Sequence, residues 1–304
     1  MDSRATEEQQ FLTALGRQVR HVRALRGMSR KVLARVSGIS ERYIAQLESG
    51  QGNVSIKLLR RVAAAMGVRV EDLIVDEAAP QDWPIFRDLL RTAAPVHVAE
   101  ARAILSGASR APAAARAAPP ADRVALVGLR GAGKSTLGRI AAERLGWDFV
   151  ELNREVERAN GLSVGEILAL YGQEGLRRRE QTMLRELIAR PGAMIVATGG
   201  GIVAEPLTFD LLLASFVTVW LKAAPEEHMA RVRQQGDLRP MADDRAAMAE
   251  LRTILESREP LYARAPIIVD TSGIAIEPAA ESLVAAIKAM GRGSPTSPLN
   301  VRGR

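Results

Sequence analysis

The feature that most constrains this chain is a glycine-rich loop between a strand pattern and a helix pattern. An apolar run at 123–127 leads into Gly128-Leu129-Arg130-Gly131-Ala132-Gly133-Lys134-Ser135-Thr136, and a helical stretch follows at 134–145. This order is the phosphate-binding P-loop, G-x-x-x-x-G-K-[ST], in the strand–loop–helix context that it requires. The glycines let backbone N–H groups turn toward phosphate oxygens, and the helix start adds the positive end of its dipole. The sequence therefore predicts a phosphate-binding α/β domain.

We assign phosphate binding to this loop and to the first turn of the following helix. Lys134 is expected to neutralise the outer phosphates, and the Ser135 hydroxyl to ligate Mg²⁺ when a nucleotide is bound. The pattern requires no cofactor, but ATP with Mg²⁺ is the one that such a loop can hold. The assigned phosphate-binding residues are Gly128, Arg130, Gly131, Ala132, Gly133, Lys134, Ser135 and Thr136.

Further apolar runs predict a parallel sheet around the loop. They lie at 193–197, 216–221 and 266–269, with a weaker candidate at 148–151. Strands that alternate with helices imply a parallel sheet covered on both faces, and ligands bind such sheets at the carboxyl ends of the strands. We place this α/β domain at 123–290 and expect the tail at 291–304 to be disordered.

The N-terminal 75 residues have the pattern of a compact all-α bundle. The expected helices run over 11–27, from a Ser29 cap to Val36, from a Ser40 cap to Gly50, over 55–66 and over 70–75. A helix, a short turn with Gly38 and a second helix that begins at Ser40 match the helix-turn-helix layout. The sequence thus predicts two domains, an all-α helix-turn-helix domain at 1–75 and the α/β P-loop domain.

The charge of the N-terminal domain favours DNA as its partner. Residues 1–75 hold 13 Lys and Arg against 7 Asp and Glu, which is nearly all of the chain's net charge of +7. In a helix-turn-helix the second helix enters the major groove, where Arg pairs with guanine and Gln with adenine. The assigned DNA-binding residues are Arg30 and Lys31 on the preceding helix and Ser40, Glu41, Arg42, Tyr43 and Gln46 on the recognition helix. A small protein-interaction module is the alternative.

The remaining segments and residue types narrow the function further. Residues 76–122 are expected to be a linker, with helices near 85–90 and 98–105 and a flexible Ala- and Pro-rich stretch from 106. The chain has no cysteine, and its three histidines lack ligand spacing, so a metal site formed by these residues is not expected. Without a membrane-spanning run or a signal peptide, the protein is expected in the cytoplasm, with no membrane partner.

Two family resemblances support this division. The segment from Leu15 to Ile74 resembles the Cro/repressor-type helix-turn-helix family. That resemblance rests on Ser29, Leu33, Ala34, Gly38, Ser40, Ile44, Leu47, Glu48, Gly50, Asn53, Ser55, Leu58, Ala63, Gly67 and Val68. Residues 123–290 resemble shikimate kinase. This second resemblance rests on the P-loop, on Gly-Gln-Glu-Gly-Leu-Arg ending at Arg177, on Gly199-Gly200-Gly201, on Asp237-Leu238-Arg239-Pro240 and on Arg258-Glu259-Pro260-Leu261-Tyr262.

The second resemblance implies roles for particular residues. Arg177 and Arg258 would face an anionic group of the ligand, and Arg239 would reach nucleotide phosphates from a mobile lid. Shikimate kinases carry Asp-x-Asp after the second strand, where this chain reads Glu151-Leu152-Asn153. Glu151 can still serve Mg²⁺ through water, but a neutral Asn153 cannot act as a general base. We therefore assign no catalytic residue and expect a kinase-like domain used for binding. The assigned effector-binding residues are Glu151, Asn153, Arg177, Gly199, Gly200, Gly201 and Arg258.

The order of the domains also resembles the benzoyl-CoA-responsive regulators of bacterial benzoate catabolism. That resemblance implies a homodimeric repressor of degradation genes, which binds double-stranded operator DNA and is released when the effector benzoyl-CoA accumulates. Two alternatives stay open. One is an active shikimate or related small-molecule kinase with an accessory DNA-binding domain, and the other is a DNA-binding protein whose α/β domain only dimerises.

Overall fold

The computed structural model describes most of the chain. The described residues are 2–51, 53–74, 86, 89–90, 93–105, 119–234, 244–290 and 299–302. Residues 76–85, 87–88, 91–92 and 106–118 of the expected linker lie outside this set, and with them most of the helix expected near 85–90. The stretch from Asp237 to Pro240 lies outside it as well, and with it the expected lid residue Arg239.

The N-terminal domain is a bundle of short helices, as predicted. Its elements are α1 (Asp2–Leu25), α2 (Arg30–Ser37), α3 (Glu41–Glu48), α4 (Ile56–Met66) and the 3-10 helix η1 (Val70–Asp72), and the linker contributes α6 (Pro95–Leu105). Ser29 and Ser40 cap α2 and α3 through their side chains, and Ser55 caps α4. α1 begins earlier than predicted because its first turns hold Glu, Gln and Ala, which favour helix without an apolar stripe.

Close helix contact organises the helix-turn-helix core. Leu33 of α2 and Ile44 of α3 are fully buried, together with Val19 of α1. Gly38, in the left-handed conformation, ends α2 and permits the short turn to α3. Gly16 lets α1 approach α3, since a Cβ at this position would lie 2.5 Å from the Leu47 carbonyl oxygen.

The C-terminal domain alternates strands and helices. Its elements are β1 (Arg123–Val127), α7 (Lys134–Leu145), β2 (Asp148–Glu151), α8 (Leu152–Asn160), α9 (Val164–Ala189), β3 (Met194–Ala197), η2 (Ile202–Ala204), α10 (Pro206–Ser215), β4 (Val217–Lys222), α11 (Pro225–Gln234), α12 (Asp244–Tyr262), β5 (Ile267–Asp270), α13 (Ile276–Met290) and β6 (Leu299–Arg302). The five predicted strands are all present, within one or two residues of their expected bounds.

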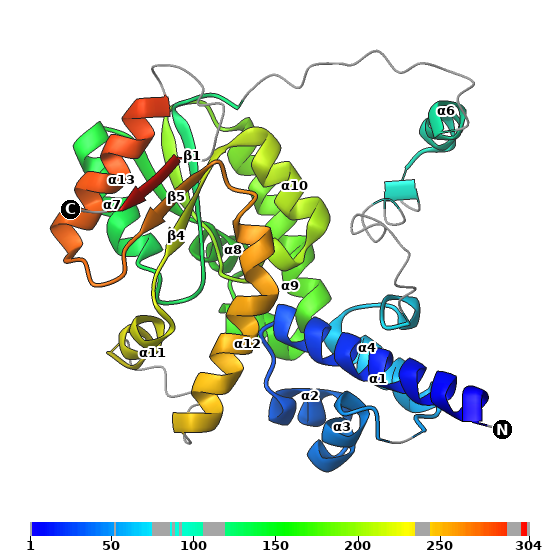
Figure 1. The fold of residues 1–304 in the computed structure, drawn as a ribbon. Coiled ribbons are helices and arrows are strands. Elements are labelled where there is room, and N and C mark those ends of the chain that lie inside the picture. Colours follow the sequence, from blue (N-terminus) through cyan, green and yellow to red (C-terminus); the bar gives the residue numbers. More distant parts are fainter. Residues whose placement is uncertain are drawn as a thin grey trace.

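Helices cover both faces of the sheet (Figure 1). The strand order is β2-β3-β1-β4-β5-β6, and all neighbouring strands are parallel. Val124 and Leu126 of β1 pack with α7 and α13, whereas Ala125 and Val127 face the core beneath α8, α9 and α10. The strand order reverses at β1, so the carboxyl ends of β1 and β3 meet at the place where parallel sheets bind ligands.

Four residues of the tail form a strand, where disorder was predicted for 291–304, and the other residues of the tail lie outside the described set. Leu299–Arg302 form β6, which pairs with β5 in parallel register from Ile267 opposite Leu299 to Asp270 opposite Arg302. The pattern of the tail did not reveal a strand of four residues. Its pairing partner is the outer edge of β5, whose backbone groups would otherwise lack partners in the sheet.

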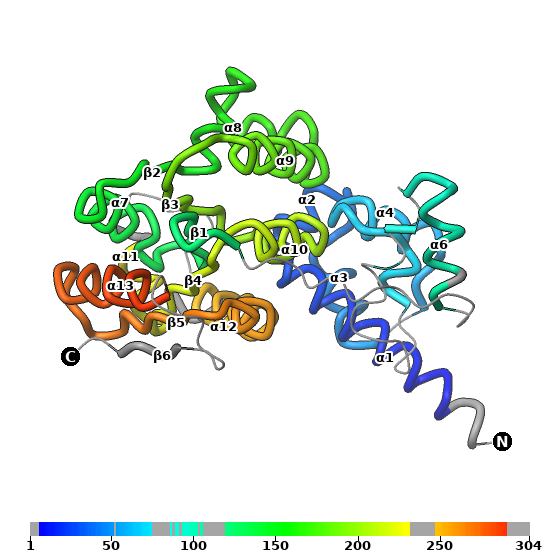
Figure 2. The backbone as a smooth tube through the Cα atoms, turned by 90° about the horizontal axis from the view of Figure 1, so that it is seen from above, coloured from blue at the N-terminus to red at the C-terminus, as the bar shows by residue number. Residues whose placement is uncertain are grey.

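The two domains contact each other directly. The C-terminal half of α1 runs beside α12, and α4 contacts α9. Figure 2 shows the helical domain beside the α/β domain, with the N-terminal end of α1 pointing away from the sheet. In Figure 1, α3 lies on the side of α1 that is remote from the sheet. No helix among the described residues is long and apolar enough to cross a membrane.

Candidate functional site

The P-loop joins β1 to α7 with the backbone that its glycines allow. Gly128, Gly131 and Gly133 have φ of 142°, 79° and 88°, a region that other residues rarely adopt. No side chain caps the start of α7, and its first turn holds no acidic residue. The first N–H groups of α7 are therefore directed toward a place that suits an anion.

Lys134 points back into this loop. Its Nζ donates hydrogen bonds to the carbonyl oxygens of Gly128 at 2.8 Å and Leu129 at 2.9 Å. Burial, with the positive charges of Arg258 and Arg130 nearby, lowers the pKa of Lys134 to about 7. An anionic phosphate at the loop would favour the charged ammonium, which is the role predicted for this lysine.

His228 of α11 holds the loop from the other side. Its Nδ1 lies 3.0 Å from the Arg130 carbonyl oxygen, and since a carbonyl only accepts, Nδ1 carries the proton. Burial lowers the pKa of His228 to about 4, so the ring is neutral at pH 7. Sequence reasoning considered His228 only as a metal ligand and missed this contact, because the pattern gave no sign that α11 packs against the P-loop.

The predicted glycine triplet lies between the P-loop and Asn153. A Cβ on Gly200 would approach the Arg130 backbone nitrogen at 3.1 Å, and a Cβ on Gly199 would approach Asn153 Oδ1 at 3.1 Å. The Asn153 Oδ1 atom is itself buried and has no hydrogen-bond partner. The glycine triplet thus lies close to the P-loop, and Asn153 faces the same space.

Arg177 and Arg258 lie at the other side of the triplet. Arg177 Nη1 donates to Glu180 Oε2 at 2.5 Å, and a Cβ on Gly201 would meet the Arg177 guanidinium. Arg258 Nη1 donates to the Gly200 carbonyl at 3.0 Å, and the Tyr262 hydroxyl donates to the same oxygen at 2.6 Å. Sequence reasoning missed Glu180, which is fully buried, because one Glu three positions after an Arg is common on any helix.

The residues predicted to hold a nucleotide and its Mg²⁺ differ in how well their positions suit these roles. Ser135 and Thr136 are exposed at the start of α7 beside the loop, as a metal-ligating hydroxyl and a phosphate contact require. The backbone cradle, the Lys134 ammonium and the Ser135 hydroxyl together fit a nucleotide phosphate with its Mg²⁺. Glu151 instead pairs with Arg154 Nε at 2.5 Å. Within the described residues no group of three His, Asp or Glu is arranged to hold a metal ion.

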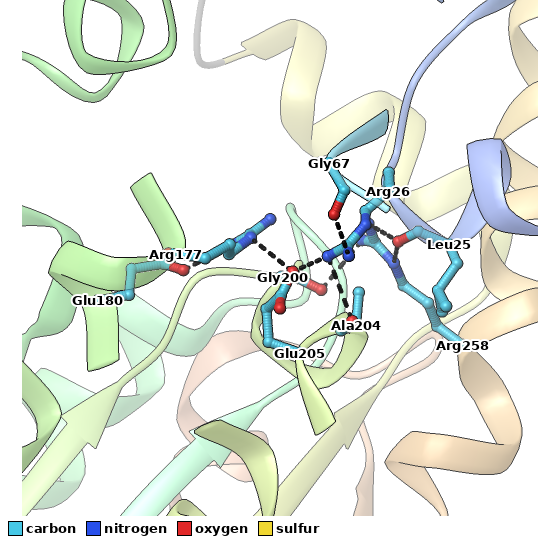
Figure 3. A network of polar contacts seen from close by, with 9 residues as sticks. All are labelled: Leu25, Arg26, Gly67, Arg177, Glu180, Gly200, Ala204, Glu205 and Arg258. Atoms are coloured by element: carbon cyan, nitrogen blue, oxygen red, sulfur yellow. Dashed lines mark hydrogen bonds and ion pairs between the residues drawn. The ribbon is translucent and has the colours of Figure 1, made fainter. Parts of the chain in front are cut away.

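A network of polar contacts joins this site to the DNA-binding domain (Figure 3). Arg258 Nε and Nη2 donate to the carbonyl oxygen of Leu25, at 2.9 and 2.6 Å. Arg26 forms an ion pair with Glu205, whose Oε1 also lies 3.7 Å from Arg177 Nε. Arg26 and Glu205 had no place in the sequence prediction, because no local pattern connects residues that are so far apart in the chain.

The recognition helix presents the predicted side chains to solvent. Glu41, Arg42 and Gln46 are exposed on α3, whereas Tyr43 is half-buried against the core. Ser40 is exposed too, but its Oγ accepts the Tyr43 N–H as the helix cap. Glu41, Arg42 and Tyr43 lie in the first turn of α3, and Gln46 lies about one turn further along the helix. The N-terminal residues of a recognition helix are the ones that contact base edges.

The phosphate contacts predicted on α2 are of two kinds. Lys31 is exposed, whereas Arg30 Nε donates to Glu48 Oε2 at 2.7 Å and keeps 40% of its side chain accessible. Glu48 is buried and also accepts from Arg23 Nε at 2.5 Å. Glu48 is therefore a partner inside the helical domain, and it holds Arg30 in place.

Comparison with known proteins covers both domains. The profile of the shikimate kinase family matches residues 130–288, and a helix-turn-helix profile matches residues 19–73. The Thermus thermophilus shikimate kinase is 35% identical over 165 residues, which are 54% of this chain and 89% of that enzyme. The chain belongs to the shikimate kinase family. The Symbiobacterium thermophilum member is 40% identical over 146 residues, which are 47% of this chain and 82% of that enzyme.

Solved structures agree with this family assignment. The shikimate kinase of Acinetobacter baumannii, solved in complex with shikimate, is 30% identical, with a TM-score of 0.51. The match covers 57% of this chain and 95% of that one. The Bacteroides thetaiotaomicron shikimate kinase is 28% identical, with a TM-score of 0.51, over 55% and 98%. The predicted fold class is confirmed, and the helix-turn-helix domain is an addition to the shikimate kinase fold.

Proposed function

We propose that this chain is a DNA-binding transcription regulator whose kinase-like domain binds an anionic effector without phosphorylating it. The observation that carries the proposal is Asn153, which faces Gly199 beside an intact P-loop. An amide cannot take a proton from a substrate hydroxyl, and loss of such a base costs roughly 10²–10⁴-fold in rate. The helix-turn-helix domain with an exposed recognition helix supplies the second half of the function.

The DNA-binding half acts as a homodimer in this proposal. One recognition helix of eight residues offers few base contacts. Two copies that contact half-sites about one helical turn apart would supply a specific site on double-stranded operator DNA. A site of this kind would let the protein repress the genes beside it.

Benzoyl-CoA is the effector that we propose for the second half. Its pyrophosphate and 3′-phosphate suit the P-loop and Lys134. Its benzoyl end has no hydroxyls, so a carboxylate at position 153 would be desolvated without a partner, whereas the neutral Asn153 avoids that cost. Such an effector acts only if it binds the DNA-released state more tightly than the DNA-bound state.

The test measures DNA affinity with and without this effector. The full chain is used to select a duplex from a random library, and binding to that duplex is followed by fluorescence anisotropy. Benzoyl-CoA should lower the affinity, whereas benzoate or CoA alone should not. Lys134→Ala should abolish the response and leave effector-free DNA binding intact, and Lys288→Ala, an exposed lysine of α13, is the matched control. If benzoyl-CoA neither binds the protein nor shifts the DNA complex, this effector is wrong.

An active shikimate kinase with an accessory DNA-binding domain is the alternative, and the intact P-loop favours it. A coupled ATPase assay with shikimate distinguishes the active kinase from the regulator that only binds its effector. A wild-type kcat in the enzymatic range of about 1–10³ s⁻¹ would establish the alternative. Under our proposal the wild type shows negligible turnover, and Glu151→Asp with Asn153→Asp recovers at most a trace.

A further inference from the structure

Arg258 is a buried cation that lacks an anionic partner. It is 5% exposed, and its three hydrogen bonds go to the carbonyl oxygens of Leu25 and Gly200. Among the described residues, no carboxylate pairs with its guanidinium. Neutral carbonyls compensate a buried charge only in part, so this guanidinium would gain from an anionic oxygen.

The edge of Arg258 that best suits an anion is occupied by the DNA-binding domain. Nε and Nη2 form the side of the guanidinium that binds a carboxylate or phosphate through two parallel hydrogen bonds. Both groups donate to the Leu25 carbonyl, at the C-terminal end of α1. That carbonyl lies at the negative end of the helix dipole and takes the place that an anion would take.

The second contact of the interface depends on the other arginine of the site. Glu205 pairs with Arg26 and lies 3.7 Å from Arg177 Nε, which is buried without a hydrogen-bond partner. A ligand anion between Arg177 and Arg258 would repel the Glu205 carboxylate and draw Arg177 away from it. The ligand would therefore weaken two of the polar contacts at the end of α1, and the hydrogen bond from Arg26 Nη1 to the Ala204 carbonyl at 3.3 Å would remain.

We propose that the docked helix-turn-helix domain and an anionic ligand compete for the same edge of Arg258, so that ligand binding releases α1 from the kinase-like domain. This competition rests on the proposed function and supplies the route by which the effector site reaches the DNA-binding domain. The ligand class is a small molecule that brings two anionic oxygens of one carboxylate or phosphate to Arg258. Benzoyl-CoA would do so with its 3′-phosphate while its pyrophosphate lies at the P-loop, and shikimate with its carboxylate. Release would free the helix-turn-helix domain from its fixed orientation. In a dimer, that orientation would set the distance between the two recognition helices on DNA.

A disulfide across the interface tests the competition. The natural chain has no cysteine, and a Cβ on Gly67 would lie 3.6 Å from the Gln173 Cβ, a separation that suits a disulfide. Oxidised Gly67→Cys/Gln173→Cys is locked in the docked state, and its reduced form has the same sequence. Gly67 has φ of +64°, so the single Gly67→Cys variant controls for backbone strain.

Ligand affinity of the full chain is measured by calorimetry without DNA, with benzoyl-CoA and with shikimate as the two probes. Whichever probe binds wild type should bind the locked form at least about tenfold more weakly than the reduced form. The reduced form should bind it as tightly as wild type does. Equal affinity of the locked and reduced forms would overturn the competition. If the locked form also loses DNA affinity when the effector is added, the proposed function holds and only the competition is wrong. Binding of neither probe to wild type would overturn both.

A second variant tests the same idea without a disulfide. Arg26→Ala removes the ion pair to Glu205 from the DNA-binding domain and leaves the kinase-like domain unchanged. It should bind the probe more tightly than wild type, because docking no longer opposes binding, while Arg20→Ala, exposed on α1, should not differ from wild type. Weaker binding by Arg26→Ala would overturn the competition, since Arg26 would then be a ligand contact.

Discussion

At the scale of single residues, the candidate phosphate site centres on Lys134, a half-buried lysine whose charge is expected to depend on the ligand. Lys134 donates to two carbonyl oxygens, and burial next to Arg258 and Arg130 lowers its pKa to about 7. An anionic phosphate restores the preference for the ammonium. Between about pH 7 and the ordinary value near 10.5, ligand binding must therefore bring a proton to Lys134.

We predict that ATP binding at pH 8.5 takes up close to one proton and that the uptake disappears at pH 6. Above pH 7 the affinity should fall about tenfold per pH unit, because the free protein is mostly neutral at this lysine. Calorimetry in two buffers of different ionisation enthalpy measures the uptake. Lys134→Arg is the matched control, since an arginine stays charged and should show none. A binding enthalpy independent of buffer at pH 8.5 would contradict the prediction.

At the scale of elements, we predict different roles in DNA binding for α2 and α3. Arg42 is exposed on α3, where it is the predicted base contact, whereas Arg30 on α2, the predicted phosphate contact, is held by the buried Glu48. Base contacts carry sequence information, and phosphate contacts carry affinity that depends on salt. Substitution of the two arginines should therefore affect DNA binding differently, one through sequence preference and the other through overall affinity.

We predict that Arg42→Ala weakens binding at the specific site by about 1–3 kcal/mol and relaxes the preference at one base position. Arg30→Ala should weaken binding to all sequences similarly and reduce the salt slope by about one. Anisotropy titrations over a salt series, on the selected duplex and on a scrambled one, distinguish the two. Arg178→Ala, exposed on α9, is the control. If Arg42→Ala and Arg30→Ala both leave the affinity unchanged, α3 is not the recognition helix.

The contact between α1 and α3 gives a second prediction at this scale. Ala favours helix over Gly by up to about 1 kcal/mol, so Gly16→Ala would stabilise an isolated α1. In the fold its Cβ would lie 2.5 Å from the Leu47 carbonyl oxygen, a backbone atom that cannot move freely. We therefore expect destabilisation by about 1–3 kcal/mol in urea unfolding. A Cβ on Gly165 in α9 would make only an ordinary van der Waals contact, with Ser163 Oγ at 3.8 Å, so Gly165→Ala should be neutral or stabilising. A neutral or stabilising effect of Gly16→Ala as well would show that the close approach of α1 to α3 is unimportant.

The elements also show what the sequence can and cannot predict. The caps at Ser29 and Ser40 and the strand before the P-loop depend on neighbours in the chain, and the pattern located them to within a residue or two. The glycine triplet, Arg177 and Arg258, which the family resemblance grouped into one site, lie beside one another in the structure. The pairing of β6 and the partners Glu180 and Glu205 depend on distant contacts, which neither periodicity nor local motifs encode.

At the scale of the molecule, the added domain changes what a shikimate kinase fold can do. The helix-turn-helix domain contacts the candidate site through the Leu25 carbonyl, which accepts from Arg258, and through Arg26, which pairs with Glu205. α3 lies on the far side of α1 and stays exposed in this docked arrangement (Figure 1). Under the proposed competition, binding at the site would reach α3 through α1 as a rigid helix, without a conformational change inside the DNA-binding domain.

The last prediction concerns the strength of this docking. The Arg26 side chain is 9% exposed and its partner Glu205 22%, so their ion pair is largely shielded from water. Arg26→Ala leaves a partly buried carboxylate with only the longer contact to Arg177, a loss of about 1–3 kcal/mol. Since that loss falls on the interface, the helix-turn-helix domain should unfold at a lower temperature and separate from the transition of the kinase-like domain. Differential scanning calorimetry of the full chain should show one transition for wild type and for Arg20→Ala, and two for Arg26→Ala. Superimposable traces for Arg20→Ala and Arg26→Ala would mean that this ion pair does not hold the domains together.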